Sequence, residues 1–151
     1  MKLLLRRLLP TLLVSLLGLL ASTSVLIRDA LADGPLLVVN LAGKFKPCPG
    51  APPGCERILL RGDPQSEPFH IVYRFPKGWM FPKHWHVSAE NLVMVRGLLT
   101  INSEGGREQS LKAGDYLYIP ANLVHWGVCP EDCVFYLGLD GPDSFNVVEE
   151  K

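Results

Sequence analysis

Residues 78–97 read GWMFPKHWHVSAENLVMVRG, and the spacing of the polar residues decides how this stretch folds. In a β-strand, side chains two positions apart point to the same face, whereas in a helix they diverge. His84 and His86, on either side of Trp85, therefore favour a strand that presents two imidazoles together. The next three residues can turn the chain and bring in Glu90 at the start of another strand. Imidazole and carboxylate groups bind transition metals, so the stretch predicts three ligands of one ion.

Short β-rich runs separated by Gly, Pro and Asp turns continue on both sides of this stretch. That pattern is typical of an all-β sandwich or barrel. Paired glycines in SEGGRE (103–108) accept positive φ and indicate a hairpin turn. The run NLVMVRGLLTI could be taken for a helix, but its β-branched residues and its glycine argue against one. The expected strands span residues 36–41, 57–62, 69–75, 81–86, 91–102, 114–120, 123–128 and 134–139.

The first 32 residues have the three-part layout of a secretory signal peptide. A positive start that includes Arg6-Arg7 precedes an apolar run, and residues 30–32 (Ala-Leu-Ala) form a small-x-small cleavage site. The alternative is a retained membrane anchor, which Pro10 and an uncharged stretch of barely spanning length weaken. The arginine pair also partly resembles a twin-arginine export signal. We therefore expect cleavage after Ala32 and a secreted or periplasmic protein.

Residues 33–151 then remain, and these 119 residues suit one small domain with a single core. The leader holds four of the 15 basic and one of the 15 acidic residues, so the remainder has 11 basic and 14 acidic residues and a net charge of −3. No basic patch or Lys/Arg run survives, which argues against nucleic acid as a partner. After signal cleavage we expect no membrane partner either.

All four cysteines lie in the part that would be exported, and an even count in an oxidising compartment predicts two disulfides. Cys48 and Cys55 bracket a turn-rich PGAPPG loop, and Cys129 and Cys133 bracket a short PED turn. Local pairing is the simplest connectivity, although the sequence leaves three open. The alternative, a four-thiolate zinc site, would need reduced cysteines and a CxxC-like spacing that neither pair has.

Two motifs of the chain resemble the two signature motifs of the cupin superfamily. Residues 78–97 follow G-x5-H-x-H-x3-E-x6-G, and residues 114–129 follow G-x5-P-x-N-x2-H-x3-C. The second motif has Asn122 where glycine is usual and Cys129 where asparagine is usual. Because asparagine tolerates left-handed φ, the first change is easily absorbed. More loosely, the sequence of residues 61–142 resembles small exported single-domain cupins.

The resemblance implies a small all-β jelly-roll barrel that holds one divalent metal ion. Its ligands would be His84, His86, Glu90 and His125. The residue spacing already brings the first three together, and the resemblance supplies the geometry for His125. That histidine follows a turn between two strands and could approach from across the barrel. His70 lies mid-strand with no partner two positions away, so we expect it on a polar face.

Three histidines and one carboxylate suit iron, manganese, copper, nickel or zinc, and the sequence does not choose among them. A redox metal with an open position could bring an enediol or catechol-like molecule together with O₂, as an oxidoreductase of the dioxygenase type does. Glu90 could leave the ion and act as the base. A non-redox ion could act as a Lewis acid. Two alternatives stay open: a non-catalytic module that binds a small ligand or metal, and a purely structural ion.

Strand alternation predicts which side chains surround the ion. Leu92 and Met94 are in register with Glu90 and should point inward. Four further neighbours are candidates by alternation alone, each more often ordinary core than a substrate contact: Tyr116, Tyr118, Phe135 and Leu137. The expected partners are a small molecule and a second copy of the chain. Cupins that resemble this one often form dimers, and the exposed edges of a small barrel make that reasonable.

Overall fold

The computed structural model describes residues 40–149. The predicted signal peptide lies outside this range, as do four of the six residues of the predicted strand 36–41, whose remaining residues Asn40 and Leu41 are not in a strand. Residues 40–149 contain eleven strands and no helix, which confirms the all-β prediction. Within the described residues there is accordingly no helix long and apolar enough to cross a membrane.

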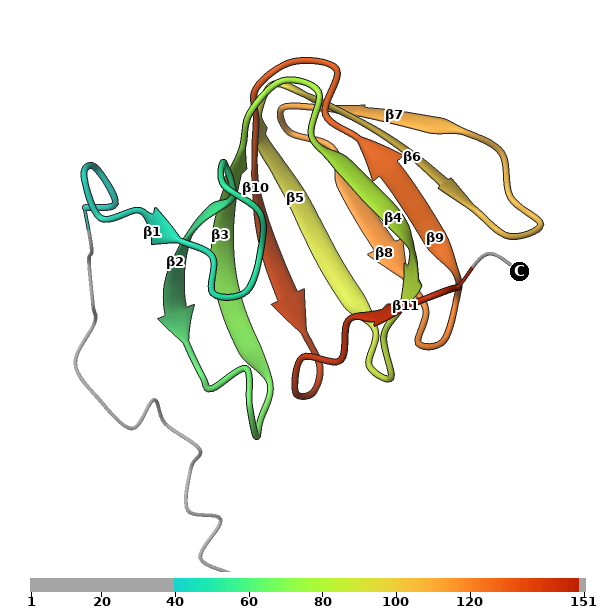
Figure 1. The fold of residues 1–151 in the computed structure, drawn as a ribbon, viewed down its shortest axis with the longest axis horizontal. Coiled ribbons are helices and arrows are strands. Elements are labelled where there is room, and N and C mark those ends of the chain that lie inside the picture. Colours follow the sequence, from blue (N-terminus) through green and yellow to red (C-terminus); the bar gives the residue numbers. More distant parts are fainter. Residues whose placement is uncertain (1–39, 150–151) are drawn as a thin grey trace, which may run out of the picture. The chain divides into compact units, whose positions relative to one another are not determined.

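The strands form two antiparallel sheets, which Figure 1 shows side by side. One sheet has the order β1-β2-β3-β10-β5-β8 and the other has the order β11-β4-β9-β6-β7. The bounds are β1 (Lys46–Pro47), β2 (Glu56–Arg61), β3 (Phe69–Phe75), β4 (Met80–Trp85), β5 (Glu90–Arg96), β6 (Leu98–Ser103), β7 (Gln109–Lys112), β8 (Tyr116–Ile119), β9 (His125–Val128), β10 (Cys133–Leu139) and β11 (Asn146–Val147).

Successive strands from β3 onward mostly change sheet, so the chain passes back and forth between the two layers. This is the jelly-roll arrangement that the resemblance implied. The sheets do not close into a continuous barrel, but one core joins their inner faces. Its fully buried side chains come from both sheets and include Ile71, Met94 and Leu99. The sequence did not reveal the short strands β1, β7 and β11.

The predicted strand 91–102 is in fact two strands that belong to different sheets, β5 and β6. Gly97 separates them with φ +81°, and a Cβ atom there would lie 1.9 Å from the carbonyl oxygen of Asp132. Only glycine avoids both the left-handed strain and this contact. The prediction of one continuous strand was wrong because the apolar pattern runs on unchanged through the crossing.

Both disulfides join cysteines that are close in the sequence. Cys48 is bonded to Cys55 and Cys129 to Cys133, and the described residues contain no free cysteine. The second bond closes the turn between β9 and β10, where both of its cysteines are fully buried. Closing loops this short stabilises the fold by about 2 kcal/mol each on the chain-entropy account.

Candidate metal centre

Three strands bring the four predicted ligands together. His84 lies on β4, and His86 follows the end of that strand. His125 begins β9 and is the direct antiparallel partner of His84. Glu90 begins β5 in the opposite sheet. The expectation that His125 approaches from across the barrel was therefore wrong: it comes from the neighbouring strand, and Glu90 crosses over.

The four side chains converge in the interior. Their exposed fractions are only 4–6%, and one ligand atom from each lies within 4.8 Å of all the others. The Nε2 atoms of His86 and His125 are 3.3 and 3.2 Å from Oε1 of Glu90. Burying a carboxylate among three imidazoles is costly unless a cation or a full set of hydrogen bonds compensates.

Backbone carbonyls fix the orientation of two of the imidazoles. Nδ1 of His84 lies 2.7 Å from the carbonyl oxygen of Pro82, and Nδ1 of His125 lies 2.9 Å from that of Leu123. Because a carbonyl can only accept, each Nδ1 must carry the proton, which leaves the Nε2 lone pair for the centre of the cluster. Metal-binding histidines are commonly held in this way.

Two buried atoms of the cluster have no hydrogen-bond partner among the described residues: Oε1 of Glu90 and Nδ1 of His86. The short approach of His125 to Glu90 satisfies the carboxylate only when that ring is protonated on both nitrogens, because the carbonyl of Leu123 already accepts the Nδ1 proton. A cation between the Nε2 atoms and Oε1 would satisfy it. The donor set and its orphaned oxygen therefore fit a divalent metal ion.

The protonation states support the same reading. Burial and the neighbouring charge of His125 lower the pKa of His84 to about 4, and burial lowers the pKa of His86. Burial alone would raise the pKa of Glu90, but the contact with His125 and the charges of the other histidines outweigh it and lower that pKa. At neutral pH the site therefore offers two neutral imidazoles, those of His84 and His86, and an ionised carboxylate. Burial alone would lower the pKa of His125, but the hydrogen bond to Glu90 outweighs it and raises that pKa, so a metal ion would displace a proton from that ring when it binds.

A cavity of about 560 Å³ opens onto the four ligands. Its walls are mainly apolar, and aromatic rings form much of them. Phe75 lies at the centre of this group, with ring centroids 4.9 Å from Phe81, 5.1 Å from Trp79 and 5.5 Å from Phe135. Small-molecule sites are typically concave, largely apolar and provided with a few placed polar groups.

Most of the predicted neighbours of the ion do face inward. Leu92 and Met94 have exposed fractions of 4% and 1%, as their register with Glu90 predicted. Leu92, Phe135 and Leu137 line the cavity, whereas Met94 is not one of its lining residues and packs in the core.

The prediction for Tyr116 and Tyr118 was wrong. Their exposed fractions are 60% and 53%, and they lie on the outer face of β8. Ile119 is the register partner of Glu90, so Ile119 and Leu117 take the inward positions of this strand. The alternating sequence fits either phase, and only the pairing with β5 decides between them.

Several cavity residues were not anticipated. Phe145 stacks on the ring of His84 with centroids 4.0 Å apart, and Oδ1 of Asp143 lies 3.7 Å from Nδ1 of His86. Both lie between β10 and β11, beyond the last predicted strand. Arg57 and Tyr73 also line the cavity, from β2 and β3. For Tyr73 the alternation of residues 69–75 was a usable signal, and for Arg57 there was none.

Two smaller expectations are met. His70 is not in the ligand cluster, and its Nδ1 is hydrogen-bonded to the hydroxyl of Tyr136. Asn122 has φ +63°, the left-handed conformation expected at a position where the resemblance has glycine. The second motif therefore keeps its backbone shape despite the substitution.

Comparison with known proteins agrees with the motifs and the fold. The family model described as "Cupin domain" matches residues 71–137, a range that includes all four ligands of the cluster. This chain has the cupin fold. The match, the two motifs and the two-sheet jelly roll all lead to the same family.

The proteins similar to this chain differ in what they are named for. A DNA damage-repair/toleration protein of Arabidopsis thaliana is 28% identical over 121 residues, which span 80% of this chain but only 37% of that protein. An RmlC-like cupin of Shewanella frigidimarina has 22% identity and a TM-score of 0.58, covering 73% of this chain and 93% of its own. An acetylacetone dioxygenase of Acinetobacter johnsonii has 20% identity and a TM-score of 0.62, covering 78% and 80%. At these identities the solved structures establish the fold alone.

Proposed function

We propose that this protein binds one divalent transition-metal ion through His84, His86, Glu90 and His125. The observation that carries the proposal is the convergence of four buried ligand atoms within 4.8 Å, with a carboxylate oxygen that has no hydrogen-bond partner among the described residues. The ion is iron, manganese, copper, nickel or zinc, all of which this donor set suits.

We further propose that the site supports oxidation of a small oxygen-rich molecule, as in dioxygenases. A redox-active ion would supply the chemistry with O₂, and the protein would position the reactants. The aromatic rings around Phe75 make the cavity walls mainly apolar, and the carbonyl of Pro82 keeps the Nε2 lone pair of His84 toward the centre. Glu90 is the proposed base: its carboxylate is ionised, and it would leave the ion to take a proton from a substrate hydroxyl.

A non-catalytic role is the second candidate, because a largely apolar cavity of about 560 Å³ is also suited to holding a small ligand. Oxygen consumption with a panel of catechols and enediols separates the two. Metal-dependent uptake supports the oxidoreductase, and a metal-loaded protein that binds panel members without uptake supports the binding module.

We also propose that residues 1–32 are an export signal and that residues 33–151 form the mature domain, in the periplasm or outside the cell. The two disulfides support an oxidising compartment. The mature domain is further proposed to pair into a homodimer, which gel filtration with light scattering would test.

The first test is elemental mass spectrometry of the untagged mature protein beside the His84→Ala/His125→Ala variant. About one equivalent of metal, lost in the variant, is the expected result. Iron, manganese, copper or nickel would direct the work to redox turnover, and zinc alone would favour a Lewis-acid or structural role. Absence of metal from the wild-type protein, even after incubation with each of these ions, would refute the proposal.

A further inference from the structure

The cavity has a polar group that the metal ligands do not explain. Arg57 on β2 is the register partner of Tyr73 on β3, and both side chains line the cavity. Arg57 is the one Lys or Arg among the described residues that do so. Arg57 is only partly buried, so its charge stands at the edge of an otherwise mainly apolar cavity.

Arg57 differs from the nearby Arg74 in how its charge is compensated. The guanidinium of Arg74 forms an ion pair with Glu56 and stacks over Phe45 at 4.4 Å. None of the ion pairs between residues 40–149 includes Arg57. Its interaction is instead with the neutral phenol of Tyr73. Arg57 therefore keeps its capacity to bind an anion in the fork geometry that suits a carboxylate.

This group lies away from the metal ligands. Across the sheet, Glu90 is level with Leu139 on β10, and Leu139 is level with Phe69 on β3. Tyr73 lies four residues further along β3, about 13 Å at the usual rise of a strand. Both ends line one cavity, so a molecule of several carbon atoms could contact both.

The charges of the cavity are consistent with an anionic ligand. Its carboxylates are Glu90 and Asp143. Once a divalent ion is bound, the ion and Arg57 together exceed these two carboxylates by one positive charge. Burial, with Asp143 next, raises the pKa of Tyr73, so this phenol stays a neutral hydrogen-bond partner beside Arg57. A monoanion would bring the whole cavity to neutrality.

We propose that Arg57, assisted by Tyr73, is a carboxylate-binding subsite, and that the ligand of this protein is a small carboxylic acid. The carboxylate would bind at Arg57, an apolar body would lie against Phe75 and Phe135, and a second oxygen would face the metal ligands. This inference rests on the proposed function for its metal end only. It concerns recognition and includes no chemical step.

The test measures acid-over-amide preference by titration calorimetry on the metal-loaded protein. The probes are 5-oxohexanoate with 5-oxohexanamide, and 3-phenylpropionate with 3-phenylpropionamide, so each pair differs mainly in charge. We expect each acid to bind at least about tenfold more tightly than its amide, the difference that one charge-assisted contact provides. Arg57→Gln should bring the preference to about twofold or less, since an amide side chain keeps little of the charged contact.

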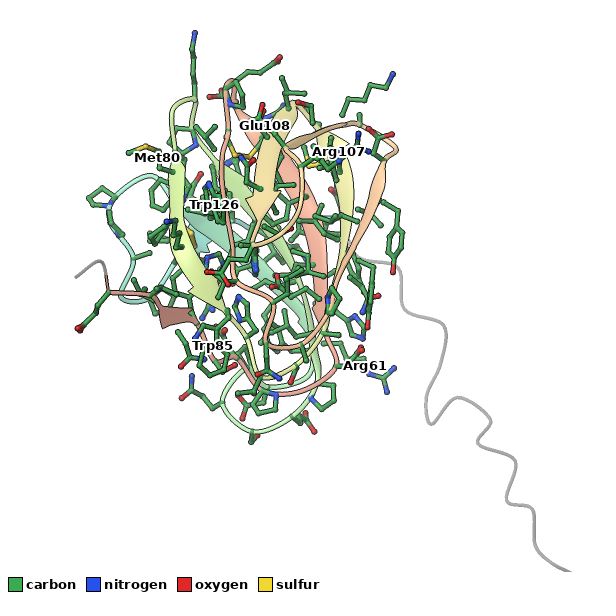
Figure 2. The ribbon with its side chains drawn as sticks, turned by 90° about the vertical axis from the view of Figure 1, so that its right-hand side faces the viewer. Arg61, Met80, Trp85, Arg107, Glu108 and Trp126 are labelled. Atoms are coloured by element: carbon green, nitrogen blue, oxygen red, sulfur yellow. A yellow bond between two sulfur atoms is a disulfide. The ribbon has the colours of Figure 1, made fainter. Side chains whose placement is uncertain are left out.

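Two further variants separate recognition from folding. Arg57→Lys keeps the charge and should keep part of the preference, and Tyr73→Phe should lower it less than Arg57→Gln does. Arg61→Gln is the matched control, since this arginine is on the same strand but exposed, and Figure 2 shows it at the surface. It should preserve the wild-type preference.

The outcomes distinguish this inference from the metal proposal. Metal content is measured on each variant, and Arg57→Gln should keep its equivalent of metal. A metal-loaded wild type that binds acids and amides equally, binds neither, or keeps its preference in Arg57→Gln would refute the carboxylate subsite alone. A wild type without metal would refute the proposed function, while the acid preference could still be measured.

Discussion

The two ends of the cavity are built in different ways. At the metal end, three of the four ligands fall within residues 84–90, around the short connection from β4 to β5. At the other end, Arg57 and Tyr73 meet only through the register of β2 with β3. One end is therefore a local feature of the sequence, and the other is a product of tertiary structure. Substitutions at the second end can change which ligand binds without disturbing the ion.

The largest effect is expected at the metal end. Glu90→Gln keeps the size of the side chain but removes its negative charge and replaces one carboxylate oxygen with an amide nitrogen. We expect metal affinity to fall by at least about a hundredfold, beyond the loss typical of residues that only support a ligand. Competition with a chelating dye, read at pH 7, measures this fall.

Tyr73→Phe is the matched change at the other end, because it removes one polar atom from the same cavity. It should leave metal affinity within about twofold of wild type, since Tyr73 is not one of the four clustered ligands. Unchanged metal affinity in Glu90→Gln would mean that Glu90 is not a ligand, and a large loss in Tyr73→Phe would mean that the two ends are not independent.

Both ends depend on the crossing between the sheets at Gly97. Gly97→Ala would force a side chain into left-handed φ and against the carbonyl of Asp132, which lies 1.9 Å from the Cβ position. We expect a loss of at least about 3 kcal/mol in the free energy of unfolding. Urea denaturation monitored by tryptophan fluorescence gives this value.

Gly105→Ala separates the two causes of that loss. Gly105 has φ +69° in the turn after β6, but nothing lies within 4 Å of its Cβ position. Its substitution should cost only the conformational strain, about 1 kcal/mol. Equal losses in the two variants would show that close packing against the β9–β10 turn is not what Gly97 provides.

The metal end should also make the metal-free protein sensitive to acid. The pKa of His84 is lowered to about 4 in the folded protein, against 6.5 for the exposed group. Between these values the unfolded chain binds the proton and the folded protein does not, so stability falls as the pH is lowered from 6.5 to 4. The lowered pKa of His86 acts in the same direction, and that of Glu90 does so below its ordinary value of 4.5. The raised pKa of His125 acts in the opposite direction around pH 6.5 and above.

The contribution of His84 to this fall is up to about 3 kcal/mol. Urea denaturation of the chelator-treated protein at pH 6.5, 5.5 and 4.5 measures it, and His84→Asn, which does not titrate, should flatten the profile. A profile with the same slope in His84→Asn would assign the acid sensitivity to other groups.

The ligand cluster could be predicted from the sequence because its information is local. A strand places His84 and His86 on one side whatever the rest of the fold does. Glu90 is close enough to follow by a turn. The origin of His125 could not be predicted in the same way, since its pairing with His84 depends on how β9 returns to the sheet. Here the resemblance supplied the residue, but the approach inferred for it was wrong.

The remaining errors come from patterns that fit two structures equally well. Residues 116–119 alternate, but nothing within them says which phase faces the core, and the pairing of Ile119 with Glu90 decided it. The apolar run through Gly97 gave no sign that the chain changes sheets there. The two-residue strands β1 and β11 are too short to produce a pattern. Long-range register, which propensity does not encode, accounts for each of these cases.

The smallest predicted effect concerns Asn122, where the chain departs from the usual cupin motif. With φ +63°, asparagine tolerates a conformation that glycine adopts freely and alanine resists. Asn122→Gly should therefore change stability by no more than about 0.5 kcal/mol, and Asn122→Ala should cost about 1 kcal/mol. The backbone N–H of Asn122 donates to the carbonyl of His86 at 2.8 Å, and both variants keep that bond. Metal content should consequently match wild type in both. Loss of metal in Asn122→Gly would show that the asparagine side chain helps to hold His86, a chemical role at a position that otherwise supplies only backbone shape.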